Sequence, residues 1–236
     1  MALPLQNAAI YSLVIPSTGK EIKYRQFFVK DEKALMIAQQ SEDLKVMINT
    51  LKSVIKSCVT DNIDVESLAI FDLEYIFAQI RAKSVGEFSE LVFTCGHCDN
   101  EKNKYTMRLD VSSINVTKNP DHKNKIDLFD DVGVVMKYPN LDILTKIDKG
   151  FDDPDNVIDI ITDCIETIYT GDTLYHAKEQ TKKELREFVE NLTKDQFDRL
   201  ETFFATMPKF QHQVEFNCGA CGTHNKTMLE GVQNFF

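Results

Sequence analysis

The composition of this 236-residue chain excludes several classes of protein before any motif is considered. A net charge of −10 argues against a nucleic-acid-binding surface, which needs a basic stripe. No uninterrupted apolar stretch approaches the roughly 18 to 20 residues of a membrane span, so we expect no such span. The length and a hydrophobic content of 43% allow a packed core in one large or two small domains.

The first third of the chain predicts a hairpin followed by helices. Two β-rich runs, 10–15 and 21–25, flank a turn that contains a proline and a glycine. Apolar residues then recur at three- and four-residue steps across 31–58, and a capping cluster at 41–43 divides this stretch into two helices. A further helix begins at about residue 65 or 71 and runs to residue 82.

The middle of the chain predicts a hairpin that carries two cysteines and then irregular structure. Strand-like runs at 90–94 and 105–109 flank the pair Cys95–Cys98. Residues 115–127 are polar and predict a loop in which His122 is solvated. A short strand and a helical turn follow, at 132–138 and 141–147.

The last third predicts helices and then a second cysteine hairpin. Asp153 and Pro154 supply an N-cap and a first-turn proline, and we expect Gly171 to end that helix. Two more helices begin at capping boxes, in which two side chains reciprocally satisfy free amides: Thr181 with Glu184, and Thr193 with Gln196. The tail predicts strand, cysteine pair and strand again: 211–216, Cys218–Cys221 and 227–229.

The two Cys-x-x-Cys pairs predict a metal site. This spacing lets two thiolates on one tight turn reach a single ion at about 2.3 Å, and two such turns complete a tetrahedral set for Zn²⁺. We therefore assign Cys95, Cys98, Cys218 and Cys221 as ligands of a structural zinc ion, since four protein ligands leave no position for a reactive water. An iron–sulfur cluster is the alternative, although the ferredoxin spacings are absent.

Other readings of the cysteines carry less weight. Two disulfides would need an oxidising compartment, and the first residues lack the apolar core and basic start of a signal peptide, so we expect reduced thiols. A redox-active thiol pair is a third reading. We expect His97 and His224 to lie on the surface or to contact a cysteine ligand without binding the ion, and Cys58 and Cys164 to be packing residues on helices.

Motifs for catalysis are missing from the sequence. It contains no glycine-rich phosphate loop, no nucleophile elbow and no zinc-protease helix. We therefore expect no enzymatic activity and no catalytic residue.

The predicted fold class is α+β: a helical domain with β-hairpins and a split zinc-ribbon-like unit of four cysteines. We divide the chain into six segments: an N-terminal β-hairpin (1–30), a helical segment (31–86), the first Cys hairpin (87–114), a loop with a short strand (115–150), a second helical segment (151–208), and the second Cys hairpin packing with the first (209–236).

Several segments resemble the baseplate hub proteins of T-even-type contractile-tailed bacteriophages. The similarity covers nearly the whole chain and is weakest between about residues 115 and 153. These are packing and capping segments without catalytic residues. They are 10–13, 19–25, 71–75, 81–87, 166–172, 192–197, 203–209 and 229–236.

The resemblance implies a structural or assembly role at the baseplate hub. The partners would be other phage baseplate hub and tail proteins, met in the host cytoplasm during assembly and in the virion tail baseplate. The resemblance does not separate a hub subunit from a transient assembly factor. Phe235 and Phe236 are a candidate anchor for a partner, or alternatively part of the protein's own core. From another functional class, a zinc-ribbon nucleic-acid-binding or regulatory protein is the alternative.

Overall fold

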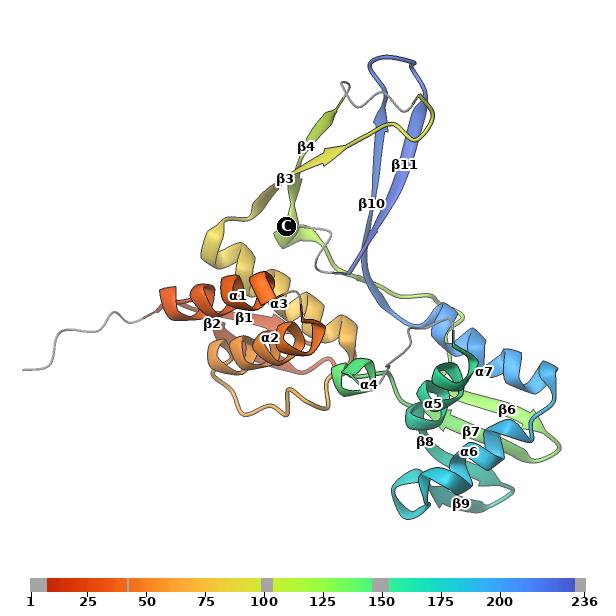
Figure 1. Ribbon diagram of the computed structural model, residues 1–236. Coiled ribbons are helices and arrows are strands. Elements are labelled where there is room, and N and C mark those ends of the chain that lie inside the picture. The colour runs from red at the N-terminus through yellow and green to blue at the C-terminus, as the bar shows by residue number, and fades with distance from the viewer. Residues whose placement is uncertain (1–7, 42, 99–103, 146–152, 232–236) are drawn as a thin grey trace, which may run out of the picture. The chain divides into compact units, whose positions relative to one another are not determined.

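The computed structural model describes residues 8–41, 43–98, 104–145 and 153–231 (Figure 1). The chain divides into two compact units: unit 1 combines residues 1–117 with 209–236, and unit 2 is the intervening segment 118–208. The chain is α+β, as predicted from the sequence. No helix in the described ranges is both long enough and apolar enough to cross a membrane. The candidate anchor Phe235–Phe236 lies outside the described residues.

Unit 1 is built from helices and short antiparallel pairings of strands. Its elements are β1 (Ile10–Val14), β2 (Glu21–Arg25), α1 (Val29–Ser41), α2 (Leu44–Cys58), α3 (Ile70–Val85), β3 (Phe88–Phe93), β4 (Tyr105–Asp110), β5 (Val116–Thr117), β10 (Lys209–Asn217) and β11 (His224–Glu230).

The N-terminal hairpin and the helices after it confirm the local sequence signals. β1 pairs antiparallel with β2, and the chain divides into α1 and α2 where the capping cluster predicted a break. The Asp43 side chain accepts hydrogen bonds from two first-turn backbone amides of α2 and so caps that helix. The core beneath them consists of branched and aromatic side chains that are almost fully buried: Ile15, Ile22, Tyr24, Ile55, Leu73, Ile76 and Ile80.

A buried ion pair joins β2 to α1 and α2. Arg25 Nη1 donates to Asp31 Oδ2 at 2.9 Å, and the two side chains are only 11% and 6% exposed. Ser57 of α2 completes the cluster: it accepts from Arg25 Nη2 at 2.7 Å and donates to Asp31 Oδ1 at 3.1 Å. The backbone N–H of Phe28 also donates to Asp31. Both oxygens of this carboxylate therefore have partners, which is what its burial requires.

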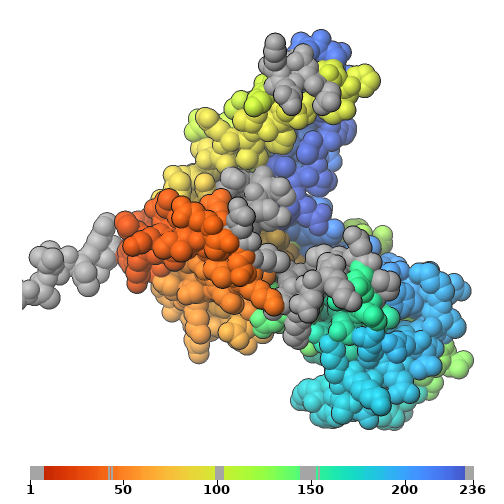
Figure 2. All heavy atoms as spheres, viewed as in Figure 1, coloured from red at the N-terminus to blue at the C-terminus, as the bar shows by residue number. Residues whose placement is uncertain are grey.

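Two antiparallel hairpins form the part of unit 1 that carries the four clustered cysteines, which we call the cysteine arm (β3, β4, β10, β11 and the two cysteine turns). β3 pairs with β4 from Phe88–Asp110 to Phe93–Tyr105, and β10 pairs with β11 over seven residue pairs. Figure 1 shows the two hairpins running side by side, and Figure 2 shows their atoms in contact. The inward residues of this arm and of α3 form one apolar cluster: Ala78, Leu91, Phe93, Met107, Leu109, Phe210, Val214 and Leu229.

The strand β5 fixes the point where unit 2 is inserted. β5 pairs antiparallel with the start of β10, with Thr117 opposite Lys209. These two residues are also the last of unit 1 before the insertion and the first after it. The chain therefore leaves unit 1 and returns to it through neighbouring strands of one sheet.

Unit 2 is a four-stranded antiparallel sheet with helices. Its strands lie in the order β6-β7-β8-β9. The elements are β6 (Lys125–Phe129), β7 (Val132–Met136), α4 (Leu141–Thr145), α5 (Pro154–Cys164), β8 (Ile165–Thr170), β9 (Thr173–His176), α6 (Lys182–Glu190) and α7 (Lys194–Thr206). One core joins the sheet to α5, α6 and α7, through Leu128, Val134, Met136, Ile161, Val189, Leu200 and Phe203.

The helix caps of unit 2 were predicted correctly, but one helix end was not. Asp153 caps α5 ahead of Pro154, and both capping boxes are present at the starts of α6 and α7. The prediction that a helix continues to Gly171 is wrong. α5 ends at Cys164 and passes directly into β8, and Gly171 takes a positive φ of 54° in the turn between β8 and β9.

His122 is half-buried and packed against aromatic rings, whereas its polar loop predicted a solvated side chain. Its ring packs against Tyr138 and Phe203 at centroid distances of 5.6 and 5.0 Å. The ring Nδ1 lies 3.0 Å from the Thr206 hydroxyl. Burial lowers the pKa of this imidazole, because removal from water disfavours the charged form. The packing therefore favours the neutral ring. The predicted loop, 115–127, also contains β5 and the first residues of β6.

A glycine in β7 makes room for a tyrosine of the next strand. The Tyr169 hydroxyl donates to Asp127 Oδ1 at 2.5 Å across Gly133, and the Lys125 ammonium lies 4.6 Å from the same ring. A Cβ atom at position 133 would overlap the phenol oxygen of Tyr169 and the carbonyl oxygen of Ile126. Only glycine therefore fits this position.

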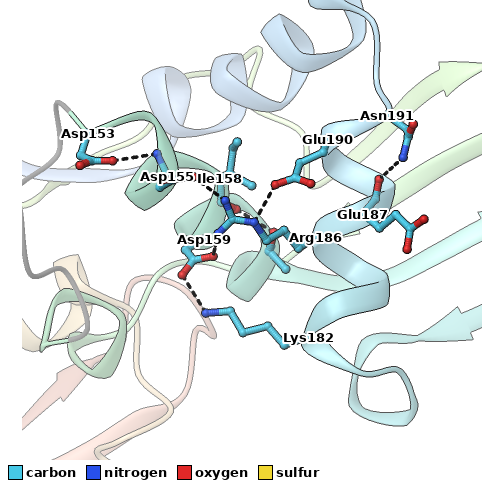
Figure 3. A network of polar contacts seen from close by, with 10 residues as sticks. Asp153, Asp155, Ile158, Asp159, Lys182, Arg186, Glu187, Glu190 and Asn191 are labelled. Carbon is cyan, nitrogen blue, oxygen red and sulfur yellow. Dashed lines mark hydrogen bonds and ion pairs between the residues drawn. The ribbon is translucent and has the colours of Figure 1, made fainter.

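A polar network on the surface of unit 2 joins α5 to α6 (Figure 3). Arg186 of α6 donates to Asp155 at 2.5 Å, to Asp159 at 2.8 Å and to Glu190 at 2.7 Å. Lys182 contacts the second oxygen of Asp159 at 2.9 Å. These carboxylates raise the pKa of the guanidinium, first of all Glu190. The network thereby orients α6 against α5.

Candidate metal centre

The two cysteine pairs lie at corresponding ends of the two hairpins in the cysteine arm. Cys95 and Cys98 follow β3, while Cys218 and Cys221 occupy the turn between β10 and β11. In the second turn, Cys218 N–H donates to Thr223 O and Gly222 N–H donates to Cys218 O, both at 2.9 Å. Gly222 has a positive φ of 72°, which this tight turn requires. The hairpins thus place two cysteine turns opposite each other.

The four sulfur atoms converge on one point. Cys95 Sγ lies 3.7 Å from Cys221 Sγ, and Cys98 Sγ lies 3.7 Å from Cys218 Sγ. All four Sγ atoms lie within 4.8 Å of one another. A regular tetrahedron with metal–sulfur bonds of about 2.3 Å has sulfur–sulfur edges of about 3.8 Å. None of the six cysteines, all of which the structure describes, forms a disulfide. The cluster therefore has the dimensions to hold one metal ion.

The local backbone favours the thiolate form that a metal requires. The N–H groups of His97 and then Cys98 donate toward the Cys95 sulfur and lower the pKa of that thiol to about 6. The hydroxyl and backbone N–H of Thr223 lower the pKa of Cys221 in the same way. Hydrogen bonds to the charged form stabilise it. The backbone of each turn thus favours the thiolate at one cysteine, Cys95 in the first turn and Cys221 in the second.

Aromatic side chains support the cysteine turns from within the arm. Phe216 stacks on Tyr105 with ring centroids 4.9 Å apart and an interplanar angle of 8°. It also contacts Phe93 at 5.7 Å, so the ends of β3, β4 and β10 nearest the sulfurs are packed together. Such packing fixes the distance between the hairpins and hence between the two pairs of sulfurs.

The histidines near the cysteines are not ligands in this arrangement. His224 Nε2 lies 3.2 Å from Glu215 and its Nδ1 lies 2.9 Å from Asn217 Oδ1, which orients the ring away from the sulfurs. Of the described side chains, the group close enough to share an ion contains the four cysteines alone. Cys58 and Cys164 are fully buried, as predicted, and burial raises their pKa values to about 11 and about 12.

Two polar residues at this centre were not predicted from the sequence. Thr223 lies beside Cys221, with its hydroxyl 3.2 Å from the sulfur. Asn225 of β11 reaches the first cysteine turn, where Gly96 N–H donates to its side-chain oxygen at 3.3 Å. The position of Thr223, two residues after a cysteine, is a signal that could have been used. Asn225 has no such signal, because its partner is 129 residues away.

Comparison with known proteins identifies the family. The family model of the T4 bacteriophage base plate protein matches residues 8–236. The chain belongs to this family. The baseplate hub assembly protein gp26 of Enterobacteria phage T4 is similar to it, with 23% identity over 231 residues, which cover 96% of this chain and 97% of that protein. No solved structure matches the chain. Membership of the baseplate family agrees with the resemblance seen in the sequence.

Proposed function

We propose that this protein acts in assembly of the bacteriophage tail baseplate hub, through contacts with other hub and tail proteins. The observation that carries the proposal is the match to the baseplate family over almost the whole chain. A relative of nearly the same length is a baseplate hub assembly protein. The protein would be present in the host cytoplasm during assembly and at the virion tail baseplate afterwards.

The chemistry of the cysteine arm supports a structural role rather than catalysis. Four cysteine ligands would fill a tetrahedral ion, so no bound water could become a nucleophile. A redox-active thiol pair, the other function considered for these cysteines, would use two sulfurs of one turn. The 3.7 Å approaches between sulfurs instead join different turns. A nucleic-acid-binding role is not favoured, given the family and the net charge of −10.

We further propose that the metal is zinc, held by Cys95, Cys98, Cys218 and Cys221. The sulfur separations suit a single ion, whereas an iron–sulfur cluster would bind the cysteines through several irons and hold them farther apart. Elemental analysis of the purified protein should give one zinc per chain. A coloured protein that contains iron would contradict zinc while leaving the set of four cysteine ligands in place.

The ion would join segments that are distant in sequence. Cys98 and Cys218 are 120 residues apart in the sequence, and all of unit 2 lies between them along the chain. The metal would therefore link two hairpins that are far apart in sequence. Metal binding is coupled to formation of such a site. Chelation of zinc should therefore loosen the arm and leave unit 2 folded, as read by hydrogen exchange on peptides from each unit.

Isolation of complexes from infected cells tests the assembly function. The tagged protein should bring down baseplate hub and tail proteins, and disruption of its gene should leave particles without complete hubs. Peptides at full stoichiometry in purified virions would indicate a permanent subunit, and their absence would indicate a transient factor. A protein that co-purifies with no tail component would contradict the proposed function.

A further inference from the structure

The side chain of Asn225 contacts both cysteine turns. Its Oδ1 accepts from Gly96 N–H of the first turn at 3.3 Å, and its Nδ2 donates to Thr223 O beside the second turn at 2.9 Å. After the backbone N–H groups of His97 and Cys98, the Asn225 side chain also lowers the pKa of the Cys95 thiol, which places its amide near that sulfur. Because Nδ2 is the donor group of this amide, it is the atom that can donate to a thiolate. One residue thus links two turns and one sulfur.

The position of Asn225 in the arm holds this side chain in place. Asn225 is paired with Phe216 across β10 and β11, and the two side chains share the inner face of the hairpin. Phe216 is buried and stacked on Tyr105. The amide therefore extends from a packed strand rather than from a mobile loop, which suits a group that must orient others.

We infer that Asn225 is a positioning residue of the metal centre, which holds the two cysteine turns at ligand distance and donates a hydrogen bond to the Cys95 sulfur. This inference rests on the proposed metal site. Loss of outer hydrogen bonds to metal ligands typically costs 10- to 100-fold in metal affinity. We expect a loss in that range for Asn225 variants.

Asn225→Asp is the sharpest variant, because it keeps the shape and the acceptor for Gly96 N–H but removes the N–H donor that faces Thr223 O and the Cys95 sulfur. Asn225→Leu removes both without adding charge. Asn217→Asp is the matched control: it adds the same charge next to Cys218, but Asn217 Oδ1 bonds to His224 rather than to a sulfur. All are made in the full-length protein.

The test uses Zn²⁺ affinity from competition with a chromophoric chelator, and the absorption of the Co²⁺-substituted protein. A hydrogen bond to a thiolate stabilises the sulfur lone pairs, so its loss should move the sulfur-to-cobalt charge-transfer band to longer wavelength. Both Asn225 variants should bind zinc 10- to 100-fold more weakly and show this shift, and the Asn217 control should do neither.

The outcomes separate this inference from the proposed function. A parent protein that binds neither metal through its cysteines would overturn the metal site, and the inference with it. A parent protein that binds zinc, with Asn225 variants of unchanged affinity and unchanged cobalt spectrum, would overturn the role of Asn225 alone. Weaker binding without a spectral shift would also contradict the hydrogen bond to sulfur.

Discussion

Replacing Asp31 with asparagine should destabilise unit 1 far more than the loss of one surface charge would. The substitution keeps the shape of the side chain and removes the charge opposite Arg25. The Arg25 and Asp31 side chains are 11% and 6% exposed, so the guanidinium would remain buried without a counter-charge. Breaking one partner of a buried pair costs about 3–5 kcal/mol, against about 0–1 kcal/mol for a surface pair.

The expected cost for Asp31→Asn lies at the lower end of that range, at about 3 kcal/mol. The carboxamide can still accept from Arg25 and can donate to Ser57, which limits the number of unsatisfied groups. Burial alone would raise the pKa of Asp31, but the hydrogen bonds from Phe28 and Arg25 outweigh burial and lower it. The carboxylate therefore stabilises the fold above its unfolded-state pKa of about 3.9, and this contribution is lost as the pH falls through the lower folded pKa.

Hydrogen exchange followed by mass spectrometry measures the effect where it should occur, on peptides from β2, α1 and α2. Glu32→Gln is the control, since Glu32 is exposed on the same turn of α1 and should change stability by less than about 0.5 kcal/mol. Asp31→Asn should also flatten the acid limb of the stability profile. If Asp31→Asn costs no more than the control, the buried ion pair does not stabilise unit 1 and the reasoning is wrong.

Four further predictions concern unit 2 and the metal. Gly133→Ala should destabilise unit 2 by more than about 3 kcal/mol, because overpacking alone costs about 1–3 kcal/mol and here a backbone carbonyl is also in the way; urea denaturation of the variant measures this. Tyr169→Phe should be milder, at about 2 kcal/mol for loss of a hydroxyl that is hydrogen-bonded to the Asp127 carboxylate and lies near Ile126 O, and equal losses from the two variants would contradict the steric argument. Replacing 118–208 by a two-residue turn should leave zinc binding intact, since Thr117 and Lys209 are already paired, and loss of zinc would show that the arm depends on unit 2. Cys98→Ser should release the zinc, and elemental analysis that still finds one ion per chain would remove Cys98 from the ligand set.

The sequence predicted those features of the fold that depend on interactions between residues close together in the chain, such as helix caps. Thr181 and Thr193 cap their helices because each meets a partner three residues later, and no tertiary information is needed for that. β8 was missed because α5 runs into it without a turn residue. The β-branched run Ile165, Thr167 and Ile168 was the available signal, and Gly171 was misread as a helix end.

The same difference between local signals and distant contacts applies to the candidate metal centre. The four cysteines could be named from spacing alone, because a tight turn with two thiols is a local feature. The groups that orient the sulfurs could not be named. Asn225 hydrogen-bonds to a turn 129 residues away. In unit 2, likewise, His122 packs against Tyr138 and Phe203 from distant segments, which its local sequence did not indicate. Contacts of this kind leave no periodic pattern in the chain.

Because the two cysteine turns are far apart in the sequence, they are synthesised at different times. The ribosome adds about 5–20 residues per second, so the first turn waits about 6–24 s for the 120 residues that lead to the second. All of unit 2 is translated within that interval and can fold before the arm closes. On the proposed zinc assignment, the nascent chain therefore presents two of the four ligand thiols, Cys95 and Cys98, to cellular metal before the full set exists.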